Sequence, residues 1–153
     1  MSRPSRDTVM LNIARELATR STCSRRNVGC VLTDKHGRVL AMGHNGSAAG
    51  QLHCTDFACS GALLPSGTGL DACEAIHAEQ NALMFCPDVM KIETCYVTAS
   101  PCVSCAKMLM NTSCKTIVFL EEYPHEIAKQ LWLKSNEDRA WRQHKQEERL
   151  DPV

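Results

Sequence analysis

Three side chains of the sequence could together hold a metal ion. Cys102 and Cys105 stand three residues apart in SPCVSC, and His77 stands in IHAE. Two sulfurs and a nitrogen are ligands that zinc prefers, and a catalytic zinc keeps a fourth position open for water. Pro101 is typical of a first helical turn, where Cys102 and Cys105 would face one point. The unpaired N–H groups of such a turn favour thiolates, the form that binds metal.

Glu79 follows His77 by two residues and could carry protons beside that metal. In the middle of a helix the two side chains would diverge, so we interpret HAE as a helix start that points at the site. Glu79 would then reach the bound water without binding zinc. A lone histidine is more often structural, and a lone Cys-x-x-Cys could be a redox pair. The combination H-x-E…P-C-x-x-C, however, is typical of zinc-dependent nucleobase deaminases.

Alternating helices and strands would position these residues. Asp7 is the predicted N-cap of the first helix, and residues 51–70 are predicted to be a loop. The residue pattern predicts helices at 7–20, 73–85, 101–111 and 124–135, and strands at 27–34, 37–45, 94–100 and 115–121. Such alternation indicates an α/β fold, in which helices cover both faces of a sheet.

Size and composition favour one domain and a small substrate. The 153 residues suffice for one core, so 1–153 is predicted to be a single domain. Lys and Arg together number 17, as do Asp and Glu, whereas proteins that bind long nucleic acids usually have a basic excess. Because neither a membrane span nor a signal peptide is evident in the sequence, we expect the protein to be located in the cytoplasm. If the source is viral, this is the cytoplasm of the host cell. The charged segment 134–153 is predicted to be a tail or helix.

The chain resembles the cytidine and deoxycytidylate deaminase family, and within it the bacterial and phage enzymes that act on dCMP. The resemblance covers residues 21–123 and is carried, in the family's order, by STCSRRNVGCVL, GHNGSAAG, HCTDFAC, CEAIHAEQNAL, CYVTASPCVSCAKML and EEY. Relatives usually have an aromatic residue in place of His44. The resemblance implies a three-layer α/β/α sandwich on a mixed sheet of about five strands. The fifth strand is not evident, because the sequence after residue 133 is typical of a helix or a disordered segment.

The resemblance also implies a reaction, the hydrolysis of dCMP to dUMP and ammonia, which supplies dUMP for dTMP synthesis. Zinc on His77, Cys102 and Cys105 would activate water for attack on C4 of cytosine. Glu79 would pass protons to ring N3 and to the leaving amine.

Four further residues are predicted to contact the substrate. Asn45 and Tyr123 resemble family residues that bind the nucleotide, although each could instead be a turn or core residue. Arg25 and Arg26 follow the first helix. They offer fork-shaped donors for a 5′-phosphate, or else cap that helix end.

Regulation is implied by the resemblance alone. Relatives are activated by dCTP and inhibited by dTTP, with Mg²⁺ on the effector, and are often homohexamers. No nucleic acid or membrane partner is expected. Backbone N–H groups of GHNGSAAG would lie near the effector, at Gly43, Asn45, Gly46 and Ser47.

The other cysteines fall into two groups of four. Close relatives with similar segments can hold a second, structural zinc, with His53 as a rival ligand and free buried thiols as the alternative. Such a site would order the 51–70 loop. Its predicted ligands are Cys23, Cys54, Cys59 and Cys73. Buried apolar packing is predicted for Cys30, Cys86, Cys95 and Cys114.

Two other functions are compatible with these residues. One is deamination of another cytosine nucleoside or nucleotide, or of a base in RNA or DNA. A nucleic-acid substrate would need a basic channel lined by aromatic residues, and the chain has only two Trp, two Tyr and three Phe. The other is a zinc-stabilised binding module without catalysis. Glu79 argues against it, because a structural zinc needs no proton carrier beside it.

Overall fold

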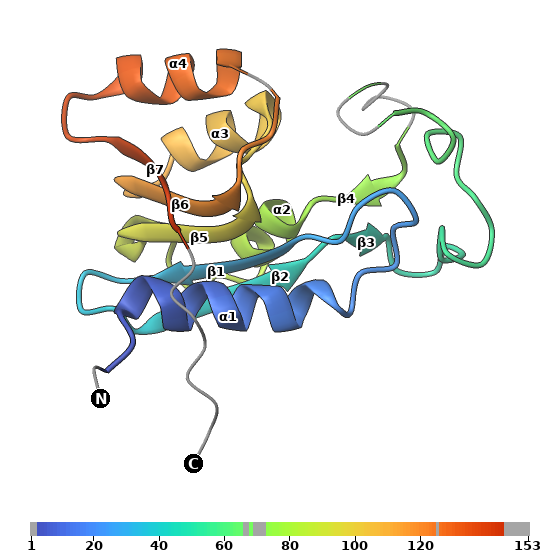
Figure 1. Ribbon diagram of the computed structural model, residues 1–153, viewed down its shortest axis with the longest axis horizontal. Coiled ribbons are helices and arrows are strands. Elements are labelled where there is room, and N and C mark those ends of the chain that lie inside the picture. Colours follow the sequence, from blue (N-terminus) through green and yellow to red (C-terminus); the bar gives the residue numbers. More distant parts are fainter. Residues whose placement is uncertain (1–2, 66–67, 69–72, 125, 146–153) are drawn as a thin grey trace.

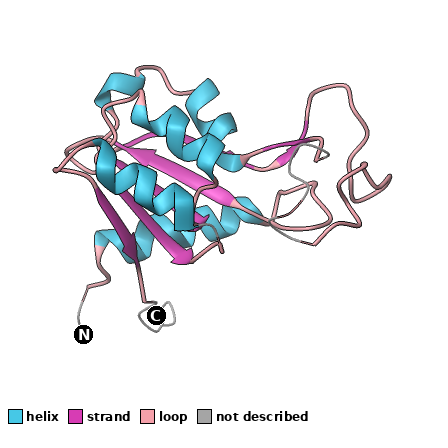
Figure 2. Ribbon diagram, turned by 90° about the horizontal axis from the view of Figure 1, so that it is seen from above, coloured by secondary structure: helices cyan, strands magenta, loops and turns pink. Residues whose placement is uncertain are grey.

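The computed structural model describes residues 3–65, 68, 73–124 and 126–145, which form a sheet between two layers of helices (Figures 1 and 2). The main sheet has the order β2-β1-β5-β6-β7 and is mixed, because β1 is antiparallel to β2 and β5 whereas β5, β6 and β7 are parallel. Its strands are β1 (Gly29–Thr33), β2 (Val39–His44), β5 (Thr94–Ala99), β6 (Thr116–Glu121) and β7 (Ala140–Gln143). The predicted mixed sheet of about five strands is confirmed.

The helices divide between the two faces of this sheet, as Figure 1 shows. One face carries α1, and the other carries α2, α3 and α4. Their bounds are α1 (Arg6–Ala18), α2 (Ala78–Met84), α3 (Val103–Met110) and α4 (Glu126–Ser135), with a 3-10 turn η2 (Val89–Lys91). None of the described helices is both long and apolar enough to cross a membrane.

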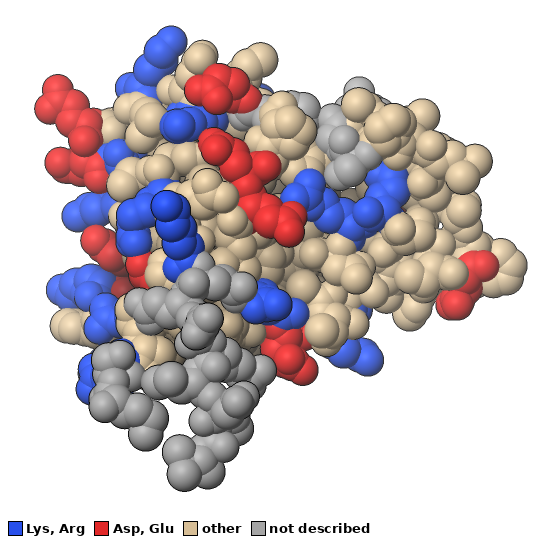
Figure 3. Space-filling model, viewed as in Figure 1, with Lys and Arg blue, Asp and Glu red and all other residues tan. Residues whose placement is uncertain are grey.

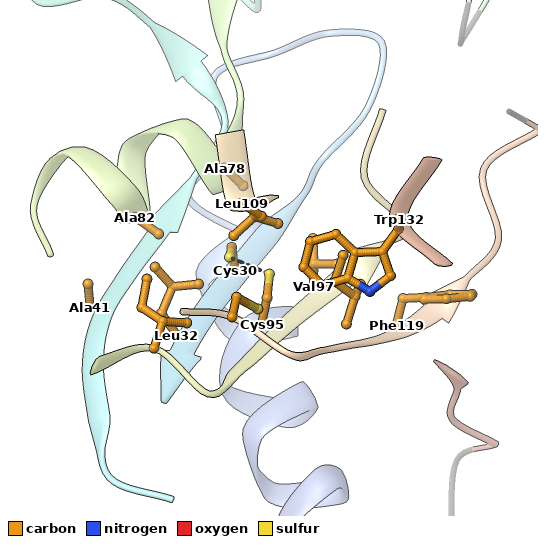
Figure 4. Packing of buried hydrophobic residues seen from close by; sticks show 13 residues of the cluster. Cys30, Leu32, Ala41, Ala78, Ala82, Cys95, Val97, Leu109, Phe119 and Trp132 are labelled. Atoms are coloured by element: carbon orange, nitrogen blue, oxygen red, sulfur yellow. Dashed lines mark hydrogen bonds between the residues drawn. The ribbon is translucent and has the colours of Figure 1, made fainter. Parts of the chain in front are cut away.

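Successive side chains of the central strands enter two separate cores. Val31, Tyr96 and Val118 pack against α1, whereas their neighbours face the other three helices. In that larger core Cys30 and Cys95 are fully buried, with their sulfurs 3.7 Å apart (Figure 4). Cys114 is buried and Cys86 half-buried, so the predicted packing role is confirmed for Cys30, Cys95 and Cys114.

Two helix starts differ from the prediction. Ser5, not Asp7, is the N-cap of α1, because the Ser5 hydroxyl accepts from the Thr8 N–H at 3.2 Å. The predicted helix at 73–85 begins only at Ala78. The preceding residues instead form β4 (Ala75–Ile76), which pairs with β3 (Gly46–Ser47).

The prediction of a tail or helix from residue 134 is wrong for Ala140–Gln143, which form β7. The Trp141 ring packs edge-on against Phe119 at 5.5 Å, and the Trp132 indole donates to the Ala140 carbonyl at 2.9 Å. The packing of Trp141 on Phe119 and the pairing of β7 with β6 join segments that are separated by α4, so the composition of the segment could not indicate them. Residues 146–153 lie outside the described part of the chain.

The predicted loop contains neither helix nor strand at residues 51–65. Residues 66, 67, 69 and 70 of that prediction lie outside the described residues.

Candidate active site

The predicted metal ligands lie at the N-termini of two neighbouring helices. His77 is the N-cap of α2, Cys102 is the N-cap of α3, and Cys105 follows one turn later. The Gln80 side chain accepts from the His77 N–H at 2.9 Å and closes the first turn of α2. The interpretation of HAE as a helix start is therefore confirmed. Helix starts aim their unpaired N–H groups at the site, which favours anionic ligands there.

The three ligand atoms converge on one point. The His77 Nδ1 lies 3.3 Å from the Cys105 sulfur and 3.5 Å from the Cys102 sulfur. Zinc bonds of about 2.3 Å to sulfur and about 2.1 Å to nitrogen would separate two tetrahedral ligand atoms by roughly 3.6 Å. All three atoms lie within 4.8 Å of one another, and the described residues contain no other such group of His, Cys, Asp or Glu. The site therefore fits a zinc ion.

Hydrogen bonds already prepare a thiolate at this point. A hydrogen bond with Cys105, assisted by one with His77, lowers the pKa of Cys102 to about 4. The bond to Cys102 and burial raise the pKa of Cys105, and the bond to Cys102 raises the pKa of His77. A metal cation would replace the protons shared among these atoms, because it binds thiolates and neutral imidazole.

Glu79 is the buried carboxylate of the site, with 5% of its surface exposed. Burial raises the pKa of Glu79, while its own backbone N–H and the nearby His77 oppose that rise. A carboxylate with a raised pKa is suited both to accept and to donate a proton near neutral pH.

Glu79 and the metal ligands open into a cavity of about 610 Å³, including its mouth. Residues from the α1–β1 connection, the end of β5 and the segment after β6 complete its walls. The lining residues outside the metal site are Cys23, Arg25, Arg26, Val28, Asn45, Cys73, Ala75, Ala78, Ala99, Ser100 and Tyr123. The cavity therefore brings His77, Cys102 and Glu79 together with basic, amide and aromatic side chains.

Arg26 faces this cavity and is held by neighbouring side chains. Its guanidinium lies over the Tyr123 ring at 4.5 Å, and its Nη2 donates to the Glu121 carboxylate at 3.1 Å. The predicted contacts Arg26 and Tyr123 therefore lie together at the cavity wall.

Arg25 and Asn45 line the same cavity but bind backbone. Arg25 donates to the carbonyls of Gly61 at 2.8 Å and Thr68 at 2.9 Å, so it ties down the long loop. The Asn45 amide donates to the Arg26 carbonyl at 2.7 Å and accepts from the Val28 N–H at 2.9 Å.

The comparison with known protein families identifies this arrangement. The model of the cytidine and deoxycytidylate deaminase zinc-binding region matches residues 4–121. The chain belongs to the cytidine and deoxycytidylate deaminase family. Within this family it is 38% identical over 128 residues to the deoxycytidylate deaminase of Mycobacterium phage D29, a match that covers 80% of this chain and 99% of that protein.

Two further relatives extend the comparison. ComE operon protein 2 of Bacillus subtilis is 39% identical over 125 residues, which cover 76% of this deaminase-family chain and 60% of that protein. The crystal structure of dCMP deaminase from the cyanophage S-TIM5 in complex with dCMP and dUMP matches with a TM-score of 0.70 and 22% identity, covering 94% and 100% of the two chains. This second match shows that the deaminase fold is shared.

The glycine-rich segment of this deaminase-family chain makes close backbone contacts. A Cβ at Gly43 would lie 2.5 Å from the Ala78 carbonyl of α2, so glycine lets that helix approach the sheet. The N–H groups of Asn45 and Ser47 already donate to the Val28 carbonyl at 3.2 Å and to the Thr22 hydroxyl at 2.9 Å. These contacts give the segment a structural task in addition to the predicted effector contact.

Two of the four cysteines predicted to bind a second zinc lie at the cavity. Cys23 and Cys73 line it, and the Cys54 sulfur accepts from the Cys59 N–H at 3.4 Å. That bond and one with Ser24 lower the pKa of Cys54 to about 7. Among the described residues, no three of these cysteines converge as the atoms around His77 do, and His53 joins no such group either.

Two residues near the cavity were not predicted. Ser100 is buried, and its hydroxyl accepts from the Tyr123 N–H at 2.6 Å. Glu121 pairs with Arg26. Ser100 could have been found from its place before Pro101 and Cys102, but no sequence signal joins Glu121 to a residue 95 positions away.

Proposed function

We propose that the chain deaminates dCMP hydrolytically to dUMP and ammonia, with zinc as its cofactor. The observation that carries the proposal is the buried Glu79 beside the convergent His77, Cys102 and Cys105, in one cavity with Arg26. The names of the phage relatives and the fold shared with a deaminase crystallised with dCMP and dUMP support the choice of substrate.

The chemistry divides between the metal and Glu79. When bound by His77, Cys102 and Cys105, zinc would supply a water that ionises near neutral pH. Glu79 accepts the proton of that water and delivers it to ring N3 as oxygen adds at C4. It then takes the remaining proton from the hydroxyl added at C4 and delivers it to the departing amine, so that C4=O forms as the C4–N bond breaks and ammonia leaves. The raised pKa of Glu79 suits both steps.

Arg26 is the proposed contact to the 5′-phosphate. It lines the cavity and its planar fork of donors matches a phosphate. Arg25 is the weaker candidate, because its Nη1 already holds two loop carbonyls. Asn45 remains a proposed substrate contact: its bond to Arg26 uses one of the two hydrogens that an amide nitrogen carries.

The charge distribution favours a small substrate over a polynucleotide. Figure 3 shows basic and acidic side chains interspersed on the face drawn, and the chain as a whole has no net charge. A polynucleotide channel would need an extended basic surface.

Ammonia release from dCMP, cytidine, cytosine and a tRNA anticodon stem tests this proposal. We expect the highest kcat/KM with dCMP, since dCMP alone offers both a free cytosine and a single 5′-phosphate. Faster release from the RNA would replace the proposal with base editing. Full zinc content without activity on any cytosine compound would favour a binding module.

Further parts of the proposal are a structural zinc, regulation and assembly. The structural zinc is proposed on Cys23, Cys54, Cys59 and Cys73, whose thiolates would require a reducing compartment such as the cytoplasm. Two zinc ions per chain, measured by elemental analysis, would support that site and one would exclude it. Assays with Mg²⁺ and dCTP or dTTP test the proposed activation and inhibition. Light scattering tests the proposed homohexamer.

A further inference from the structure

We infer that Glu121 is a positioning residue that holds Arg26 ready for the 5′-phosphate and thereby strengthens the preference for nucleotide over nucleoside. The inference rests on the proposed function and names what sets its selectivity. Glu121 is not part of the wall of the nucleotide cavity; it lines a neighbouring hollow that shares Arg26 and Ala99 with that cavity. Its carboxylate therefore binds Arg26 from outside the wall of that cavity.

Arg26 is restrained at its backbone and at its guanidinium. The Asn45 amide holds its carbonyl at 2.7 Å. The Tyr123 ring lies under the guanidinium at 4.5 Å, and the Glu121 carboxylate binds Nη2 at 3.1 Å. Of the five N–H donors that a guanidinium carries, one on Nη2 is directed to Glu121, and this bond sets the direction of the group.

Residues 121–123, which restrain Arg26, are hydrogen-bonded to Ser100, and Ser100 lies two residues before the proposed metal ligand Cys102. The Ser100 N–H donates to the Glu121 carbonyl at 2.9 Å, and the Tyr123 N–H donates to the Ser100 hydroxyl at 2.6 Å. Ser100 is 4% exposed and is followed by Pro101 and Cys102. These bonds keep the phosphate-facing arginine at a set distance from the atoms that would react.

The size of the effect follows from the exposure of the pair. A flexible arginine loses side-chain entropy when it binds a phosphate, and restraint before binding reduces that loss. The side chains of Arg26 and Glu121 are 25% and 77% exposed, and exposed ion pairs change binding by about two- to fivefold. We expect an effect of that order on KM.

The test measures kcat/KM of the full chain with zinc for dCMP and for deoxycytidine. In Glu121→Gln, the ratio of the two values falls about two- to fivefold, through a higher KM for dCMP at unchanged kcat, as expected for lost binding that does not alter the chemical step. The matched control is Glu122→Gln, which removes the same charge from the exposed neighbour and leaves the ratio unchanged.

A second pair of variants asks whether Glu121 acts through Arg26. In an Arg26→Met background, Glu121→Gln causes no further change in the ratio, because coupled residues are not additive. The inference would be overturned if the ratio of kcat/KM for dCMP to that for deoxycytidine rose or stayed constant in Glu121→Gln. It would also be overturned if Glu121→Gln lowered this ratio as much in the Arg26→Met background as in wild type. Any of these results with active wild type leaves the proposed function intact. A wild type that does not deaminate dCMP overturns both.

Discussion

In the proposed reaction, Glu79 differs from the proposed metal ligands around it in one respect: it changes protonation state. Its burial supplies the raised pKa that this requires, and its place in the first turn of α2 brings it to the ligand His77. A glutamine would have nearly the same shape but could not exchange a proton. Replacing Glu79 by glutamine therefore distinguishes an effect on proton transfer from an effect on metal binding.

Glu79→Gln should therefore lower kcat for dCMP by about a hundredfold to ten-thousandfold, the usual loss when a general acid–base is removed. Zinc content, measured by elemental analysis, should equal that of wild type. Glu74→Gln, on an exposed position of the same segment, serves as the control and should retain activity. Substantial turnover by Glu79→Gln would assign the proton transfer to another group.

Arg25 shows that two adjacent arginines can have different tasks. Its guanidinium joins the loop carbonyls of Gly61 and Thr68, whereas Arg26 faces Tyr123 and Glu121. Arg25 thus contributes to the cavity through the loop that it holds.

Arg25→Met should raise the rate of proteolytic cleavage within residues 51–65 by about tenfold, because two charge-assisted hydrogen bonds contribute about 1–2 kcal/mol against local opening. Limited proteolysis followed by mass spectrometry measures this. Arg20→Met, at an exposed site, should be cleaved like wild type. An unchanged cleavage rate would mean that other contacts hold the loop.

At the scale of elements, the site depends on how closely α2 lies against β2. Gly43 permits that contact, since a Cβ there would lie 2.5 Å from the Ala78 carbonyl and 2.6 Å from the Ala82 nitrogen. Both are backbone atoms, so only a movement of the helix could relieve the clash. The helix carries His77 at its start, and its displacement would disturb the metal ligands.

Gly43→Ala should lower the free energy of unfolding by about 1–3 kcal/mol, the usual cost of overpacking, and should also weaken zinc binding. Urea titration and a competitive zinc chelator measure the two effects. Gly46→Ala is the comparison: its Cβ would meet the Thr22 hydroxyl, and moving this side chain would break its hydrogen bond with the Ser47 N–H but would displace no helix, so a smaller loss is expected. Equal losses in the two variants would contradict this explanation.

At the scale of the whole molecule, one carboxylate joins the two ends of the described chain. Asp7 of α1 binds Arg142 of β7 and accepts from the Tyr96 hydroxyl of β5 at 3.0 Å. Next to it, the Thr8 hydroxyl lies 3.0 Å from His144 Nε2. Burial opposes the charge of Asp7, but its hydrogen bonds with Arg142 and Tyr96 outweigh burial and hold its pKa below the ordinary 3.8.

A carboxyl group whose pKa is lower in the folded state than in the unfolded state stabilises the protein at pH values above its unfolded-state pKa. This stabilisation is lost as the pH falls through the folded-state pKa. The free energy of unfolding of Asp7→Asn should therefore be about 1–3 kcal/mol lower than that of wild type at pH 7. This difference between variant and wild type should shrink below pH 3.8. Urea unfolding at both pH values measures it, with the exposed Glu16→Gln as control. A difference that does not depend on pH would show that the charge is not responsible.

The convergence of His77, Cys102 and Cys105 beside Glu79 could be predicted from sequence because the spacing within each pair is local. His77 and Glu79 share one helix start, and Cys102 and Cys105 share another, so each pair has its relative position set within a single turn. The alternation of strands and helices indicated the layers for the same reason, since apolar periodicity is a property of short segments.

Tertiary structure alone decided which arginine pairs with Glu121, which arginine holds the long loop, and where the fifth strand lies. The bonds from Arg26 to Glu121 and from Arg25 to Thr68 span 95 and 43 residues. Ala140–Gln143 form the strand β7 because their backbone pairs with β6 and because Trp141 packs on Phe119. Such contacts depend on which elements the core brings together, and no spacing within a short segment encodes them.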